Sequence, residues 1–261
     1  MPIIAATVCN ENSRTWSGNL ENKEMIIIYR IYQFTLMLPL MLAVTLLTAV
    51  TTALGSIAFG GKWWGYYPPM VWARIMCLLS WVKVEVRGHE HISRGTSYVF
   101  VANHQGAYDI FAIFGYLGHN FKWMMKKSLE KIPLVGWACK RAGEIFVDNS
   151  SPHAIKQTMK AAEKQLAGGM SLVVFPEGAR TWDGKMRRFK RGAFTLAQEF
   201  GLPVVPLTID GAFNVMPRTS KLPRYGKIIL TIHSPIASSE PELIELSRQA
   251  IASALPDNLN S

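Results

Sequence analysis

The amino-acid sequence predicts an α/β fold, with a mixed sheet flanked by helices and an N-terminal membrane-binding helical element. Three observations support this prediction. Short runs rich in β-branched and aromatic residues alternate with longer helical patterns, as they do in α/β domains. Clusters of polar residues follow directly after two of the apolar runs. A long uncharged segment precedes all of these elements in the chain.

The apolar N-terminal region begins with residues 33–61, which carry no charge. A helix of about 20 residues, rising 1.5 Å per residue, spans the roughly 30 Å hydrocarbon layer, so Leu36–Leu54 is a transmembrane candidate. Pro39 is expected to kink its start. A second apolar stretch, Trp63–Val82, is rich in aromatic residues that favour the lipid–water boundary. We interpret residues 31–82 as a membrane-binding helical pair whose second helix spans, re-enters or lies on the membrane. The alternative is a buried core helix.

Three regions are predicted along the chain: a disordered polar extension over 1–24, membrane-anchoring helices over 25–82, and an α/β domain over 83–261. The extension lacks the basic start of a secretory signal and precedes the apolar run by too far. Met25 would make a natural start, so residues before it are expected to be disordered or to reflect the choice of start site.

The α/β domain is predicted to alternate strands and helices, without repeats or a second soluble domain. The expected strands are 82–86, 97–101, 171–175, 202–209 and 227–232, and the expected helices are 109–117, 153–167 and 241–255.

The first polar cluster follows the predicted strand 97–101 and contains His104 and Asp109. Ligands bind at the carboxyl edge of an α/β sheet, where this strand-to-helix turn would lie. A carboxylate that accepts from one imidazole nitrogen leaves the other free as a general base. His104 and Asp109 are therefore candidate catalytic residues. The alternative is that Asn103 or Asp109 caps a helix and that His104 is a polar loop residue.

A second cluster, Pro176–Thr181, follows the predicted strand 171–175. Gly178 would let the backbone approach a ligand closely, and Arg180 offers a planar fork of donors suited to phosphate. A turn followed by a solvated basic loop is the alternative, which the presence of the first cluster makes less attractive. Further basic residues follow within a dozen positions, namely Lys185, Arg187, Arg188, Lys190 and Arg191.

Composition bears on the possible partners. Three cysteines without close pair spacing imply reduced thiols and no zinc site, and we predict neither a metal nor a cofactor. The net charge of +10 suits an anionic membrane surface and polyanionic substrates. Nucleic acid is the rival explanation of this charge. No recognisable nucleic-acid module accompanies the basic run, so we expect no nucleic-acid partner.

Four blocks, in order, resemble the motifs of the phospholipid/glycerol acyltransferase family. They are Asn103-His104 through Asp109, Gly143–Asp148, Phe175–Arg180 and Leu202–Leu207. The resemblance runs from about Val84 to His233.

The resemblance implies an acyl transfer with His104 as the base. His104 would remove the proton of a glycerol hydroxyl while that oxygen attacks the thioester of acyl-CoA or acyl-carrier protein, and Asp109 would hold the imidazole. The implied acceptor is 1-acyl-sn-glycerol-3-phosphate, and the product is phosphatidic acid. Glu177 would organise the phosphate loop or bind the acceptor, together with Gly178. Lys190, in a stretch similar to the family's Phe-Lys-x-Gly, would contact phosphate beside Arg180.

Two positions depart from the family pattern. Ala179 replaces a common threonine, and Asn149 stands where the family often carries an arginine that helps to hold phosphate. The change to Ala179 is small, whereas the missing arginine shifts anion binding to Arg180 and Lys190 and leaves open other acceptors, such as a lyso-ornithine lipid or lysophosphatidylglycerol. A non-catalytic membrane lipid-binding protein is the second hypothesis. The implied partners are membrane phospholipid and lysophospholipid, and the implied location is the cytoplasmic face of the inner cell membrane.

Overall fold

The computed structural model describes residues 24–148 and 150–259, and the chain divides into two compact units at 43/44. The described part of the first unit is helical from Glu24 and contains a π-helical turn, Gln33–Met37, directly before α2 (Leu38–Phe59). In this turn Leu38 N donates to Gln33 O, five residues back. Pro39 has no N–H, and its ring crowds the carbonyl four residues earlier, so the wider turn accommodates it without breaking the helix.

Within the described residues, one helix is long and apolar enough to cross a membrane. It runs over Glu24–Phe59, has a mean hydropathy of 2.1, and buries only 11% of its apolar window. This helix contains the predicted segment Leu36–Leu54. Its low burial distinguishes it from the core helix of a soluble domain, whose apolar side chains are packed.

The second apolar stretch forms α3 (Gly61–Trp64) and α4 (Tyr67–Leu79). At 13 residues α4 is about 20 Å long, which is too short to span the hydrocarbon layer. Its inner face is part of the core, where Ala73 and Cys77 are fully buried. The inner face of α4 is therefore that of a buried core helix, which is the alternative interpretation of this segment. The outer face stays apolar and exposed, so its predicted place at the membrane interface remains a prediction.

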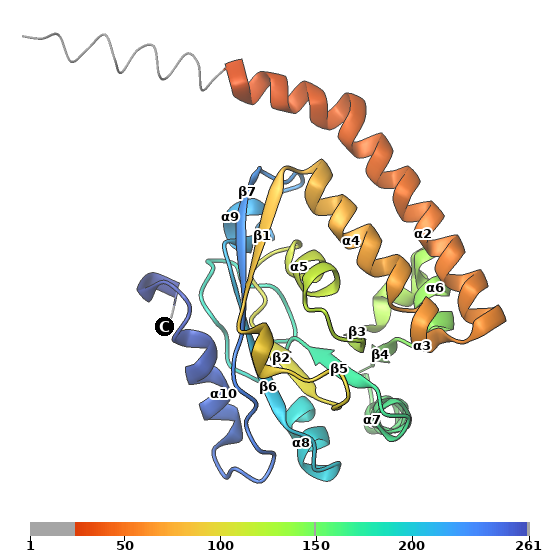
Figure 1. Cartoon of the computed structure of the whole chain (residues 1–261), viewed down its shortest axis with the longest axis vertical. Coiled ribbons are helices and arrows are strands. Elements are labelled where there is room, and N and C mark those ends of the chain that lie inside the picture. The colour runs from red at the N-terminus through yellow and green to blue at the C-terminus, as the bar shows by residue number, and fades with distance from the viewer. Residues whose placement is uncertain (1–23, 149, 260–261) are drawn as a thin grey trace, which may run out of the picture. The chain divides into compact units, whose positions relative to one another are not determined.

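In the second unit the described residues form a seven-stranded sheet in the order β1-β7-β6-β2-β5-β3-β4 (Figure 1). All neighbouring strands run parallel except β6 and β7, so the predicted mixed sheet is confirmed. The strands are β1 (Val82–Arg87), β2 (Val99–Ala102), β3 (Phe121–Lys126), β4 (Ile145–Val147), β5 (Ser171–Val174), β6 (Val204–Asp210) and β7 (Gly226–Ile232).

Helices cover both faces of this sheet, as the alternation of side chains along β2 requires. Phe100 and Ala102 pack on the side of α4 and α5, whereas Val99 and Val101 pack on the side of α8 and α10. The helices after α4 are α5 (Asp109–Tyr116), α6 (Val135–Ala142), α7 (Pro152–Ala167), α8 (Gly192–Glu199), α9 (Ala212–Val215) and α10 (Leu243–Ala252), with short 3₁₀ turns at His89–His91, Lys127–Lys131 and Asp257–Leu259.

The regions predicted over 1–24, 25–82 and 83–261 remain predictions. Residues 1–23 lie outside the described part of the chain, as does Asn149, while Glu24 begins the first helix. The described chain places α4 in the same compact unit as the sheet. The sheet brings β2 and β5 side by side, and both polar clusters of the sequence follow these two strands.

Candidate active site

His104 and Asp109 meet at the carboxyl end of β2, with 2.7 Å between His104 Nδ1 and Asp109 Oδ2. An ionised carboxylate only accepts hydrogen bonds, so the proton of this bond belongs to Nδ1. Among the described residues, His104 Nε2 has no hydrogen-bond partner, and the His104 side chain keeps 14% of its surface exposed. The carboxylate thus occupies Nδ1 and leaves Nε2 without a partner among the described residues, which is the arrangement of a general base.

Asp109 is fully buried and does not cap its helix. Its Oδ2 also accepts from Gly106 N at 2.9 Å, within the loop that holds His104. No donor among the described residues reaches Oδ1. The helix-cap alternative is thus wrong for Asp109, because its hydrogen bonds go to the loop rather than to the helix N-terminus. A buried, incompletely solvated carboxylate beside the ring stabilises the positive imidazolium that forms when Nε2 takes a proton.

Two neighbours that the sequence did not assign also fix His104. Asn103 bridges to the adjacent strand β6: its Nδ2 donates to Ile209 O at 2.9 Å, and its Oδ1 accepts from Ile209 N at 2.8 Å. Asn103 therefore ties two strands together and is not a helix cap. The ring of Phe175 stacks on the imidazole, with centroids 3.9 Å apart and planes 8° apart. Asn103 thus anchors the loop that begins at His104, and Phe175 packs on one face of the imidazole ring.

Glu177 joins the two polar loops. Its Oε1 accepts from His104 N at 2.8 Å, and its Oε2 accepts from Arg187 N at 3.0 Å. Burial, and secondarily the charge of Asp109, raises the pKa of Glu177 to about 7. Both oxygens are occupied by backbone amides, which favours loop organisation over acceptor binding as the role of this side chain.

Gly178 and Lys190 lie together beside this junction. Gly178 has φ of +76°, a conformation that L side chains rarely adopt, and a Cβ there would stand 2.7 Å from Lys190 Nζ. Lys190 N in turn donates to Pro176 O at 2.9 Å. The chain thus folds the lysine ammonium over a glycine directly after Glu177, and the positive φ at this position is what favours glycine.

Arg180 lies next to Thr181, whose N donates to His104 O at 3.0 Å. Its side chain is half-buried, and its carbonyl accepts from Arg218 at 3.3 Å. The loop therefore brings the backbone of Arg180 beside the His104 loop, and Lys190 is a second cation of the same loop. Such a pair of cations suits a phosphate.

The block Gly143–Asp148 reaches the site only through packing. Glu144 Oε2 accepts from Trp123 N at 2.5 Å, and the ring of Trp123 stacks on Phe175, which covers His104. Burial raises the pKa of Glu144 to about 7. This block lies on the edge strand β4, so its described residues support the aromatic stack rather than the base itself.

The fold and the site together define an α/β domain in which a histidine paired with a buried aspartate lies beside a loop rich in basic residues. A family model described as Acyltransferase matches residues 83–210. The chain is 34% identical over 188 residues to a chloroplastic 1-acyl-sn-glycerol-3-phosphate acyltransferase of Brassica napus, covering 71% of this chain and 54% of that protein. A 1-acyl-sn-glycerol-3-phosphate acyltransferase of Chlamydomonas reinhardtii is 29% identical over 274 residues, covering 99% of this chain and 81% of that protein.

A solved structure is similar over most of this chain. The crystal structure of the 1-acyl-sn-glycerophosphate acyltransferase from Thermotoga maritima matches with a TM-score of 0.65 and 26% identity, covering 83% of this chain and 95% of that one. The chain spans about half the length of the Brassica napus relative and of a similar protein of Arabidopsis thaliana. The chain belongs to the acyltransferase family.

Proposed function

We propose that this protein transfers an acyl group from a thioester to the free hydroxyl of 1-acyl-sn-glycerol-3-phosphate, giving phosphatidic acid. The observation that carries the proposal is the 2.7 Å contact between His104 Nδ1 and Asp109 Oδ2, with Nε2 left free beside a cationic loop. The names of the relatives support the choice of acceptor. Acyl-CoA or acyl-carrier protein supplies the thioester.

In the proposed reaction His104 Nε2 takes the proton of the acceptor hydroxyl as its oxygen attacks the thioester carbonyl. The tetrahedral intermediate then collapses by breaking the carbon–sulfur bond, and the leaving thiolate takes the proton from the imidazolium. No acyl-enzyme forms. A positioned base contributes about 10²- to 10⁴-fold in rate, and Asp109 adds to this by stabilising the imidazolium.

Arg180 and Lys190 hold the acceptor phosphate in this proposal, and Gly178 gives it access to the backbone. Glu177 acts as a positioning residue, because its carboxylate bonds the amides of His104 and Arg187. Fixing the phosphate fixes the distance from the glycerol hydroxyl to Nε2, which adds orientation to the base catalysis.

The apolar helix Glu24–Phe59 supports a membrane location, and we propose that the site acts at the cytoplasmic face of the inner cell membrane. Its partners there are membrane phospholipid and lysophospholipid. Positive charge on the protein suits this surface, since the anionic leaflet attracts each nearby lysine or arginine by about 1 kcal/mol.

The test is acyl transfer by purified protein, read by lipid mass spectrometry. Lysophosphatidate, lysophosphatidylglycerol and a lyso-ornithine lipid are each offered with acyl-CoA and with acyl-carrier protein, to wild type and to His104→Ala. Phosphatidic acid formed by wild type and lost in His104→Ala supports the proposal. A different diacyl product would overturn the acceptor and keep the base, whereas no transfer to any acceptor would favour a non-catalytic lipid-binding protein.

A further inference from the structure

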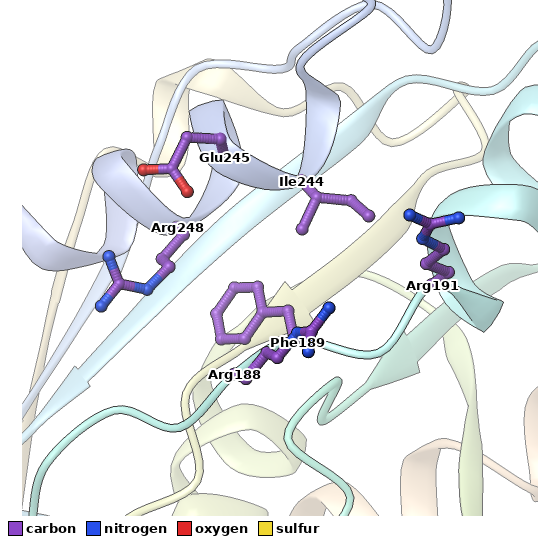
Figure 2. Close-up of a pocket in the computed structure, with 6 residues that line it drawn as sticks. All are labelled: Arg188, Phe189, Arg191, Ile244, Glu245 and Arg248. Carbon is purple, nitrogen blue, oxygen red and sulfur yellow. The ribbon is translucent and has the colours of Figure 1, made fainter.

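A groove lined by cations leads away from the site, between the loop after β5 and helix α10. Its far end holds about 450 Å³ and is lined by Arg188, Phe189, Arg191, Ile244, Glu245 and Arg248. Figure 2 shows three of these side chains, from Ile244 to Arg248, projecting from one helix above the loop that carries Phe189.

The groove borders the loop that carries Glu177. A second hollow, of about 760 Å³, shares Arg188, Phe189 and Arg191 with the first and extends to Glu177 and Lys190. Glu177 bonds the amide of His104 at 2.8 Å. A molecule lying along the groove would therefore have one end at α10 and the other at Glu177, whose carboxylate is hydrogen-bonded to the backbone of His104.

The positive charge of the groove is not neutralised by the protein. Among the described residues, no carboxylate comes within 4 Å of the side-chain nitrogens of Arg188, Arg191 or Arg248. Glu245 is the single carboxylate lining the α10 end, and its Oε1 accepts from Gln249. Guanidinium groups gathered without counterions repel one another, and a bound polyanion removes that repulsion by forming charge-assisted hydrogen bonds.

We propose that this groove binds the adenosine 3′-phosphate and diphosphate of a coenzyme A thioester, the acyl donor. The inference rests on the proposed function. Both hollows fall in the range of about 300 to 1,000 Å³ that is typical of small-molecule sites. An acyl-carrier protein would instead need about 800 Å² of protein surface. The long pantetheine arm of the coenzyme separates the phosphates from the thioester, as the groove separates α10 from His104.

The first experiment measures binding without turnover. Coenzyme A and 3′-dephospho-coenzyme A are titrated into the full chain in neutral detergent by calorimetry. Arg188→Gln, Arg191→Gln and Arg248→Gln are each expected to weaken coenzyme A binding about tenfold, and the triple variant at least about a hundredfold. Wild type is expected to prefer coenzyme A over the dephospho form, and the triple variant to lose that preference.

Two variants separate this effect from misfolding and from net charge. Lys156, Lys160 and Lys164 are exposed on α7, and changing all three to Gln removes the same charge; this control should bind coenzyme A like wild type. Glu245→Gln removes the carboxylate from the groove and should tighten binding severalfold, a gain that loss of structure does not produce. Equal weakening in the α7 control, or weaker binding in Glu245→Gln, would overturn the proposal.

Kinetics then relate the groove to the proposed function. The triple arginine variant should raise the KM for acyl-CoA and leave the KM for lysophosphatidate unchanged. If wild type binds coenzyme A through the groove but transfers no acyl group, the proposed function fails and the site stands. If wild type transfers acyl groups while the arginine variants bind coenzyme A normally, the site is wrong. Turnover with acyl-carrier protein alone, or loss only of binding to vesicles containing phosphatidylglycerol, would also reject it.

Discussion

Replacing Asp109 with asparagine should remove a buried charge while keeping His104 in place. One oxygen, Oδ2, accepts from both His104 Nδ1 and Gly106 N, at 2.7 and 2.9 Å, whereas no donor among the described residues reaches Oδ1. An asparagine with its carbonyl at the Oδ2 position keeps both bonds. The proton then stays on Nδ1, and Nε2 remains able to accept one, so the substitution isolates the effect of charge.

The magnitude follows from the contact between the two groups. Unit charges 4 Å apart attract by about 4 kcal/mol at an effective dielectric constant of about 20. In the proposed mechanism His104 gains positive charge as it takes the substrate proton, so this attraction acts in the transition state and not on bound substrate. A loss of about 4 kcal/mol corresponds to a fall of about 10³-fold in kcat, with the KM for the acceptor unchanged.

Initial rates of phosphatidic acid formation, measured over a range of lysophosphatidate concentrations, test this expectation. Asp257→Asn is the matched control, because Asp257 is an exposed carboxylate in the 3₁₀ turn Asp257–Leu259 and should leave kcat unaltered. Asp109→Ala loses the hydrogen bonds as well as the charge and should be at least as slow. A kcat of Asp109→Asn within tenfold of wild type would refute the electrostatic role, and so would a loss confined to KM.

Three further predictions concern the residues around the base. Burial raises the pKa of Glu144 from 4.5 to about 7, so its contribution to stability is present below pH 4.5 and is lost as pH rises through 7. The unfolding free energy should fall by up to about 3 kcal/mol over that window, and thermal unfolding at several pH values should show a smaller fall in Glu144→Gln. Gly178→Ala places a Cβ 2.7 Å from Lys190 Nζ on a residue whose φ is positive, and it should raise the KM for lysophosphatidate about tenfold or more. Gly192→Ala is the control, because a Cβ there meets nothing within 4 Å. Asn103→Ala leaves the N–H and C=O of Ile209 without their side-chain partner and should destabilise the protein by about 3 kcal/mol. Denaturant or thermal unfolding measures this loss. A loss below about 1 kcal/mol would mean that strands β2 and β6 do not depend on the Asn103 bridge.

The sequence predicts the α/β class and the contact between His104 and Asp109 well because local patterns determine them, whereas the catalytic role of the pair stays a prediction. Predicted strands 171–175 and 227–232 match β5 and β7 to within a residue. Both polar clusters stand at strand ends, and the parallel pairing of β2 with β5 brings them together. That pairing is not local and is seen only in the structure, whereas the shared edge follows from the rule that parallel strands place their carboxyl ends on one side of the sheet.

Other elements escape prediction because tertiary contacts decide them. Strand β3 (Phe121–Lys126) contains two lysines, and Lys122 is buried only because its Nζ donates to Gly61 O at 2.7 Å, from a residue 61 positions away. The short α4 looks like a membrane segment from composition, yet its small residues pack into the core. Asn103 could be read only as a cap or a motif residue, since its partner Ile209 lies 106 residues on.

One carboxylate, that of Glu177, holds two amide hydrogens that are far apart in the chain. His104 N–H and Arg187 N–H point at its two oxygens, at 2.8 and 3.0 Å. Neither amide can exchange with deuterium oxide while that carboxylate is in place, and both become exposed if it withdraws. Paired exchange rates at these two amides would therefore report how often the catalytic loop opens, without any substrate present.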